Sequence, residues 1–129
     1  MIGIVIVAHG GLASEYKAAV EYVVGKQKGI VAVTILPDCN RERKRDEICQ
    51  AADSVDAGTG VVIVTDMFGG SPSNLSMYAC NCSNRRVLYG ANLPLLVKLA
   101  KCREKPLQNA ISQAIVSGRK YMDCLPEVS

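Results

Sequence analysis

The first residues of the chain form an uninterrupted apolar run, and this run constrains the fold more than any other feature of the sequence. Ile2–Ala8 consists almost entirely of β-branched and aliphatic side chains, without the polar alternation of a strand that faces water on one side. A short continuous run of this kind is typical of a parallel strand that is buried on both faces. The chain is therefore expected to build a sheet with helices on both sides.

Three further runs repeat this signal, and helical patterns lie between them. The predicted strands are Ile2–Ala8, Ile30–Leu36, Val61–Thr65 and Arg86–Tyr89. The predicted helices are Leu12–Val24, Asn40–Val55, Pro72–Cys82, Leu93–Lys101 and Pro106–Val116, with Gly118 as the expected stop of the last one. Strands that alternate with helices predict βαβ units and a three-layer α/β sandwich around a mainly parallel sheet. Residues 120–125 are the candidate for a final antiparallel strand at an edge of that sheet.

The composition limits the class of protein. The chain has 129 residues, of which 49% are hydrophobic, so residues 1–129 are expected to form one domain around a single core. The net charge of +3 is mild, and acidic neighbours dilute the basic stretch at residues 41–45, which argues against nucleic-acid binding. No apolar run reaches the roughly 18 residues of a membrane span. No basic segment precedes the N-terminal run, so no signal peptide is expected and the protein is predicted to be cytoplasmic.

The six cysteines do not indicate a disulfide framework or a metal site. No export signal accompanies them, and several fall at apolar positions of the predicted helices, so free buried thiols are expected. Cys80 and Cys82 are the only close pair, and no second pair or further histidine completes a zinc site. No metal is expected.

The single histidine of the chain stands where α/β proteins place their chemistry. His9 directly follows the first predicted strand. Ligands of open α/β sheets bind just beyond the carboxyl ends of the strands, so His9 is a candidate nucleophile or base. The alternative is a histidine that only ends a strand and bonds to a neighbouring loop.

A second group of candidate residues follows the third predicted strand. Asp66 comes directly after that strand, and Gly69, Gly70, Ser71 and Pro72 then open the next helix. Ser71 is expected to cap this helix, with Pro72 at its first helical position. Glycines let backbone N–H groups approach a ligand, and the start of a helix attracts anions, so Gly69, Gly70 and Ser71 are candidate phosphate ligands. The alternative is an ordinary capped helix in which Asp66 is a turn residue.

The two groups form one site if their strands are neighbours in the sheet. Asp66 can then accept a hydrogen bond from one ring nitrogen of His9, which fixes the tautomer and leaves the other nitrogen as a nucleophile. The helix start and the Ser71 hydroxyl would stabilise the oxygens of a phosphoryl group, so the predicted product is a phosphohistidine. The spacings of a P-loop, a dinucleotide fingerprint and a serine-hydrolase elbow are absent, and one histidine is too few for a metal hydrolase.

These segments together resemble the IIA component of the mannose-type sugar phosphotransferase system. The likeness rests on Val-Ala-His-Gly at residues 7–10, on Asp-Met-Phe-Gly-Gly-Ser-Pro within residues 65–74, and on residues 89–95. The resemblance implies a flavodoxin-like fold and a phosphocarrier without metal or cofactor, in which phospho-HPr phosphorylates His9. Asp66 is then its hydrogen-bond partner, and Ser71 with nearby amides holds the phosphoryl group.

The same resemblance implies partners. The phosphoryl group passes to a IIB protein of a sugar permease or serves as a regulatory signal. The chain is expected to form a homodimer, in which the copies can exchange a C-terminal strand. Some relatives continue into a IIB domain, whereas this chain ends at Ser129, so donation to a separate protein is expected.

Two other functions stay open. The phosphotransfer subunit of phosphoenolpyruvate-dependent dihydroxyacetone kinase resembles this fold and also carries an N-terminal histidine, although the turn at residues 69–72 argues against it. The chain could instead be a binding module whose glycine-rich helix start holds a nucleotide or another anion, with His9 only as a contact.

Overall fold

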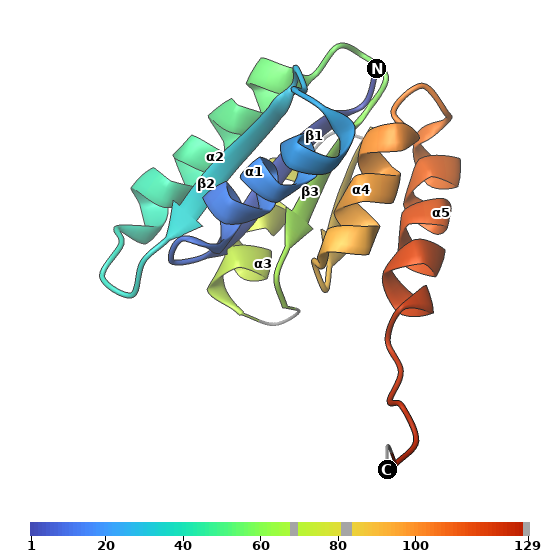
Figure 1. Ribbon diagram of the computed structural model, residues 1–129. Helices are drawn as coiled ribbons and strands as arrows, with labels where there is room; N and C mark the ends of the chain where they lie inside the picture. The colour runs from blue at the N-terminus through green and yellow to red at the C-terminus, as the bar shows by residue number, and fades with distance from the viewer. Residues whose placement is uncertain (68–69, 81–83, 128–129) are drawn as a thin grey trace.

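The computed structural model describes residues 1–67, 70–80 and 84–127, in which a four-stranded parallel sheet lies between two layers of helices (Figure 1). The strands are β1 (Gly3–His9), β2 (Ile30–Ile35), β3 (Val61–Thr65) and β4 (Arg85–Tyr89). The helices are α1 (Leu12–Val24), α2 (Arg41–Val55), α3 (Ser71–Ser76), α4 (Leu93–Lys101) and α5 (Leu107–Lys120), with a 3-10 helix, η1, at Met77–Cys80. The expected three-layer α/β sandwich is confirmed. Among the described residues, no helix combines the length and the apolar composition that a membrane-spanning segment needs.

The order of the strands places β1 and β3 side by side. The sheet runs β2-β1-β3-β4, and every pair of neighbours is parallel. Val7 of β1 is opposite Thr65, the last residue of β3, and His9 is opposite Ile35, the last residue of β2. Asp66 follows Thr65 directly, so its position lies next to the end of β1. The carboxyl ends of the three strands therefore meet at one edge of the sheet.

Both faces of the sheet are buried, as the unbroken apolar run of the first strand predicts. α1 and α4 cover one face, with α5 packed against α4, and α2, α3 and η1 cover the other (Figure 1). Ile4 and Ile6 point into the first apolar layer, and Val5 and Val7 into the second. All four side chains are at most 1% exposed. Each contributes about 1.5–3 kcal/mol through the hydrophobic effect, which explains why successive residues of β1 are all apolar.

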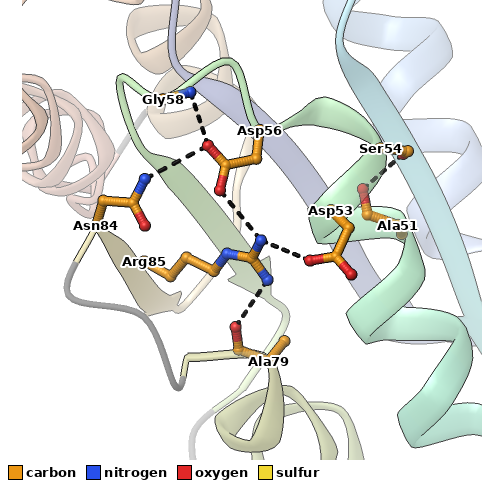
Figure 2. Close-up of polar contacts among 8 residues, drawn as sticks. All are labelled: Ala51, Asp53, Ser54, Asp56, Gly58, Ala79, Asn84 and Arg85. Atoms are coloured by element: carbon orange, nitrogen blue, oxygen red, sulfur yellow. Dashed lines mark hydrogen bonds and ion pairs between the residues drawn. The ribbon is translucent and has the colours of Figure 1, made fainter.

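Arg85 anchors the amino end of β4 to the helices behind the sheet. Its guanidinium lies 2.6 Å from Asp53 and 3.1 Å from Asp56 at the end of α2, and it donates to the Ala79 carbonyl at 3.3 Å (Figure 2). The side chain is 8% exposed, so these partners replace most of its water. The N–H of Gly58 and the Arg85 side chain hold the pKa of Asp56 below its ordinary value. The cluster ties α2, η1 and β4 together.

Arg103 anchors the amino ends of β1 and β2. It follows α4 and is 4% exposed. Its guanidinium donates to the carbonyl oxygens of Ile2 at 2.7 Å, Lys28 at 2.6 Å and Gly29 at 2.9 Å. Gly29 has φ +71°, and a Cβ at this position would lie 2.6 Å from the Arg103 guanidinium, so glycine is required for this close approach. Arg103 thereby pairs the carbonyls of Ile2 and Lys28, and it is a second donor to the Gly29 carbonyl, which also accepts from the N–H of Ile4.

The C-terminal segment contradicts two predictions. α5 continues to Lys120 instead of ending at Gly118. Gly118 lies inside this helix, and close packing against α4 explains why the residue is a glycine. A Cβ at this position would lie 3.0 Å from the Cβ of Leu95. Residues 122–127 form neither helix nor strand and lead away from the sheet (Figure 1), so the expected antiparallel edge strand is absent from the described chain. The prediction was wrong because α5 directs the tail away from β4.

The helix predicted at Pro72–Cys82 is also divided differently. α3 ends at Ser76, and η1 continues the turn to Cys80 with tighter hydrogen bonding. Cys82 lies outside the described residues. Without it, the free cysteines are Cys39, Cys49, Cys80, Cys102 and Cys124. Among these thiols full burial is confirmed for Cys102, whereas Cys124 is exposed and the other three are half-buried.

The anchoring role of Arg103 predicts a loss of stability on its removal. Arg103→Met keeps an apolar stem but removes the donor to the buried carbonyl of Ile2 and to the part-buried carbonyl of Lys28, whereas the Gly29 carbonyl keeps the N–H of Ile4. The variant is expected to lower the free energy of unfolding by about 1–3 kcal/mol. Urea denaturation followed by circular dichroism measures the change. The control is Lys105→Met, which removes one exposed hydrogen bond to Gln113 and is expected to cost less than about 0.5 kcal/mol. Equal stability of the two variants would contradict this role.

Candidate active site

Neighbouring strands bring His9 and Asp66 into contact. His9 is the last residue of β1, and Asp66 directly follows β3. Nδ1 of the imidazole lies 2.8 Å from Oδ2 of the carboxylate. The backbone N–H of His9 donates to the same oxygen at 3.0 Å. The expected convergence of these two side chains at one edge of the sheet is confirmed.

The carboxylate decides which ring nitrogen carries the proton. An ionised carboxylate can only accept hydrogen bonds, so Nδ1 of a neutral His9 must hold the proton that it shares with Asp66. Nε2 then carries the lone pair. The His9 side chain is 48% exposed, whereas the Asp66 side chain is 11% exposed. The ring is thus held from its buried side and stays open to a partner molecule from the other.

Hydrogen bonds to both oxygens hold Asp66 itself. Oδ2 accepts from the backbone and the ring of His9, and Oδ1 accepts from the N–H of Met67 at 3.0 Å. Burial raises the pKa of this carboxyl, but the three hydrogen bonds and the charge of a protonated His9 outweigh it, and the net pKa lies below its ordinary value. Asp66 is therefore ionised at neutral pH and favours any positive charge that develops on the imidazole.

The start of α3 lies beside the ring, one position earlier than expected. Gly70, with φ −82° and ψ 172°, is the N-cap, and Ser71 is the first helical residue, so Pro72 is the second. The prediction that Ser71 caps the helix was wrong, because the carbonyl of Gly70 already accepts the first helical hydrogen bond. A Cβ on Gly70 would lie 3.5 Å from Cε1 of His9, so the backbone runs close to the ring. Gly69 lies outside the described residues.

Two buried hydroxyl groups at the site escaped the sequence reasoning. Oγ1 of Thr65 and Oγ of Ser73 are 2.7 Å apart, and Ser73 donates to the carbonyl oxygen of Met67 at 2.7 Å. Thr65 is 0% and Ser73 3% exposed. For Ser73, the sequence signal was a polar residue at a core-facing position of a short helix, and this signal does not by itself indicate a functional site.

Large apolar side chains are exposed at the same edge of the sheet. Leu12 begins α1, Leu36 follows β2 and Met67 follows Asp66, and their exposed fractions are 45%, 51% and 56%. Exposed apolar side chains that gather around a polar group are typical of a protein interaction surface. In residues 1–67, 70–80 and 84–127, no group of three or more His, Cys, Asp or Glu side chains is arranged to hold a metal ion. The expectation that no metal takes part stays a prediction.

A protein family model matches most of the chain. A family model described as EIIA-man, PTS system fructose IIA component, matches residues 3–116. The mannose-specific EIIAB component of Escherichia coli strain K12 is 27% identical over 127 residues, which cover 96% of this chain and 39% of that protein. The fructose-specific EIIA component of Bacillus subtilis strain 168 is 24% identical over 105 residues, which cover 81% of this chain and 72% of that protein.

A solved structure shares the fold over nearly the whole chain. The phosphotransferase system component EIIA from Streptococcus agalactiae superposes with a TM-score of 0.84 at 22% identity, and the match covers 96% of this chain and 97% of that one. The chain spans about two fifths of the Escherichia coli protein, which is longer. Because the family model matches most of its residues, the chain belongs to the mannose-type IIA family of the phosphotransferase system.

Proposed function

We propose that this chain is a phosphocarrier of a sugar phosphotransferase system and that Nε2 of His9 carries the phosphoryl group. The observation that supports this most directly is the 2.8 Å contact between Nδ1 and Asp66, since it reserves Nε2 for nucleophilic attack. Membership of the IIA family supports the same reaction class.

The transfer step follows from the two side chains. The lone pair of Nε2 attacks the phosphorus atom of a phosphorylated donor, the bond between phosphorus and the donor nitrogen breaks, and the phosphoryl group moves to His9. The ring becomes positively charged while Nδ1 keeps its proton, and the ionised Asp66 stabilises this charge. Asp66 takes up no proton, so the same geometry serves the reverse step, in which the group leaves for an acceptor.

We assign the binding of the phosphoryl oxygens to the start of α3. Gly70 brings the main chain against the ring, and the hydroxyl and N–H of Ser71 are at the first turn, where backbone donors have no helical partner. We assign Gly69 to the same group on the sequence motif. These groups would bind the oxygens in the transition state as well as in the product.

The partners are proposed to be proteins. Phospho-HPr is the donor, and a IIB protein or a regulatory target is the acceptor, with the exchange in the cytoplasm, as the family resemblance implies. The half-exposed ring of His9, with exposed Leu12, Leu36 and Met67 at the same edge of the sheet, suits docking of a protein surface. The related Escherichia coli protein is named as an EIIAB component.

We also propose that the chain acts as a homodimer. Among the described residues β4 pairs with β3 alone, and a groove of about 410 Å³ lies between β4 and α5. The tail beyond α5 exposes Tyr121, Met122 and Leu125, which are 69%, 75% and 82% exposed. An exposed apolar tail and a strand at the end of the sheet are complementary, so the tail of one copy would pair with β4 of the other.

The role of His9 predicts where phosphate is found. Incubation with labelled phosphoenolpyruvate, enzyme I and HPr is expected to label the wild-type protein on His9, with acid-labile and base-stable label as in a phosphoramidate. His9→Gln is expected to take up no label while its circular dichroism is unchanged. Label on the variant would refute the assignment. Donation to a dihydroxyacetone kinase subunit rather than to a IIB protein would favour the alternative function.

The orienting role of Asp66 predicts a large loss of rate. In Asp66→Asn the side chain can offer either an oxygen or an N–H to the ring, so the tautomer is no longer fixed. Phosphoryl transfer from phospho-HPr is expected to slow by about 10²–10⁴-fold. The control is Asp123→Asn, an exposed residue of the tail, which is expected to react at the wild-type rate. A wild-type rate for Asp66→Asn would remove Asp66 from the mechanism.

The dimer proposal predicts a change of mass on removal of the tail. Analytical ultracentrifugation is expected to show a dimer for residues 1–129 and a monomer for a chain truncated after Lys120. The truncated chain is expected to keep its helical circular dichroism signal, because all described helices end at or before Lys120. The same mass for both chains would contradict the exchange of tails.

A further inference from the structure

We infer that Ser73 is a positioning residue for His9, acting through Met67 and Asp66. The inference rests on the proposed phosphocarrier function for its role in transfer. It concerns a chain of hydrogen bonds that begins at Thr65 in β3 and ends at the ring of His9. Ser73 does not touch the reacting atoms, so its effect reaches them through the main chain.

The direction of these hydrogen bonds follows from counting protons. Ser73 has one hydroxyl proton, and it donates this proton to the carbonyl oxygen of Met67 at 2.7 Å. The oxygen of Ser73 is 2.7 Å from the hydroxyl of Thr65, which must then be the donor in that pair. The hydroxyl of Thr65 therefore donates to Ser73, and Ser73 donates to Met67; we call this series of hydrogen bonds the relay.

Met67 is the link between this relay and the catalytic pair. Its carbonyl accepts from Ser73, and its N–H donates to Oδ1 of Asp66 at 3.0 Å. The other oxygen of Asp66 accepts the two hydrogen bonds from His9. Fixing the carbonyl of Met67 restricts rotation of this residue, so its N–H stays aimed at Asp66. The carboxylate then keeps the orientation that selects the tautomer of His9.

A comparison with Ser76 shows that Ser73 is not placed as an ordinary helical serine. Ser76 lies on the same helix and is 0% exposed, and its hydroxyl bonds back to the carbonyl of Pro72 at 2.5 Å, four residues earlier. This back-bonding is usual for serine inside a helix. The hydroxyl of Ser73 instead joins α3 to β3 and to the segment after β3. Its hydrogen bonds therefore hold the helix in place against the site.

Each member of the relay needs its partner, because a buried polar group without a hydrogen bond is destabilising. Burial of a hydroxyl without a partner costs about 1–3 kcal/mol, so removal of Ser73 leaves both Thr65 and Met67 with an unmet hydrogen bond. α3 has only six residues, and so few helical hydrogen bonds do not fix its position by themselves. The link to Thr65 supplies a fixed point on the sheet, because Thr65 ends the strand beside β1.

The test compares Ser73→Ala with the matched control Ser76→Ala. Both remove one buried hydroxyl from α3, so both lose stability, which urea denaturation measures. Ser73→Ala alone is expected to lower kcat for phosphoryl transfer by about 3–10-fold with KM for phospho-HPr unchanged, the factor that one neutral hydrogen bond supplies. Ser73→Thr keeps the hydroxyl and is expected to restore kcat. Equal kcat for the two alanine variants would overturn the inference.

A second readout does not depend on transfer. The chain has one histidine, so its ¹⁵N NMR spectrum contains one pair of imidazole signals. The wild-type ring is expected as the Nδ1–H tautomer, and Ser73→Ala is expected to add a measurable Nε2–H population, whereas Ser76→Ala is not. An unchanged tautomer in Ser73→Ala would overturn the inference. If the wild-type protein takes no label on His9 but the tautomer shifts, the proposed function fails and the positioning role stands.

Thr65→Val keeps the inference testable if Ser73→Ala does not fold. Valine has nearly the shape of threonine, and it removes the proton that Thr65 gives to Ser73 while Ser73 keeps its bond to Met67. A smaller loss of kcat, about 2-fold, and a smaller shift of the tautomer are expected, since one link of the relay remains. Wild-type kcat and tautomer in Thr65→Val would then overturn the relay.

Discussion

The site depends on the parallel pairing of β1 with β3. This pairing sets Val7 opposite Thr65, so the next residues of the two strands lie side by side where the strands end. A shift of the register by one residue would move Asp66 away from Nδ1 and would also turn every side chain of the strand to the opposite face. Both faces of β1 are packed with apolar side chains, and the same burial that stabilises the sheet therefore holds the two catalytic candidates at 2.8 Å.

The two ends of the sheet are built differently. At the amino ends of the strands, Arg85 and Arg103 are almost completely buried. Arg85 pairs with carboxylates from the end of α2 (Figure 2), and Arg103 donates to backbone carbonyls of two segments. At the carboxyl ends, His9 is half exposed and Leu36 and Met67 face solvent. Anchoring at one end leaves the other end able to hold exposed groups that contribute little to folding, and this is the end to which the proposed partner proteins would bind.

The sequence predicted the parts of this structure that depend on local pattern. The β-branched runs identified all four strands, because burial on both faces demands apolar residues without alternation. His9 and Asp66 were found because each stands directly after such a run. Ser71 was misplaced by one position, since the start of a helix depends on which carbonyl first accepts a helical hydrogen bond. The continuation of α5 through Gly118 was missed because the glycine serves close packing against Leu95 of α4, a contact between two helices that the residue pattern of α5 alone does not reveal.

Ser73 marks the limit of predicting a site from sequence, and its proposed positioning role bears on how the proposed phosphocarrier would work. Its role depends on a hydroxyl of β3 and a carbonyl after β3 that only the folded chain brings within 2.7 Å. A carrier must accept a phosphoryl group and release it again, so strong binding of the product would slow the second step. The proposed orientation of the ring through Asp66, Met67 and Ser73 would lower the barrier without favouring either direction, because the hydrogen bond from Nδ1 would be present before and after transfer. Control of the tautomer from the buried side is therefore suited to reversible transfer. Stronger binding of the phosphoryl oxygens is not, because it would slow the release step.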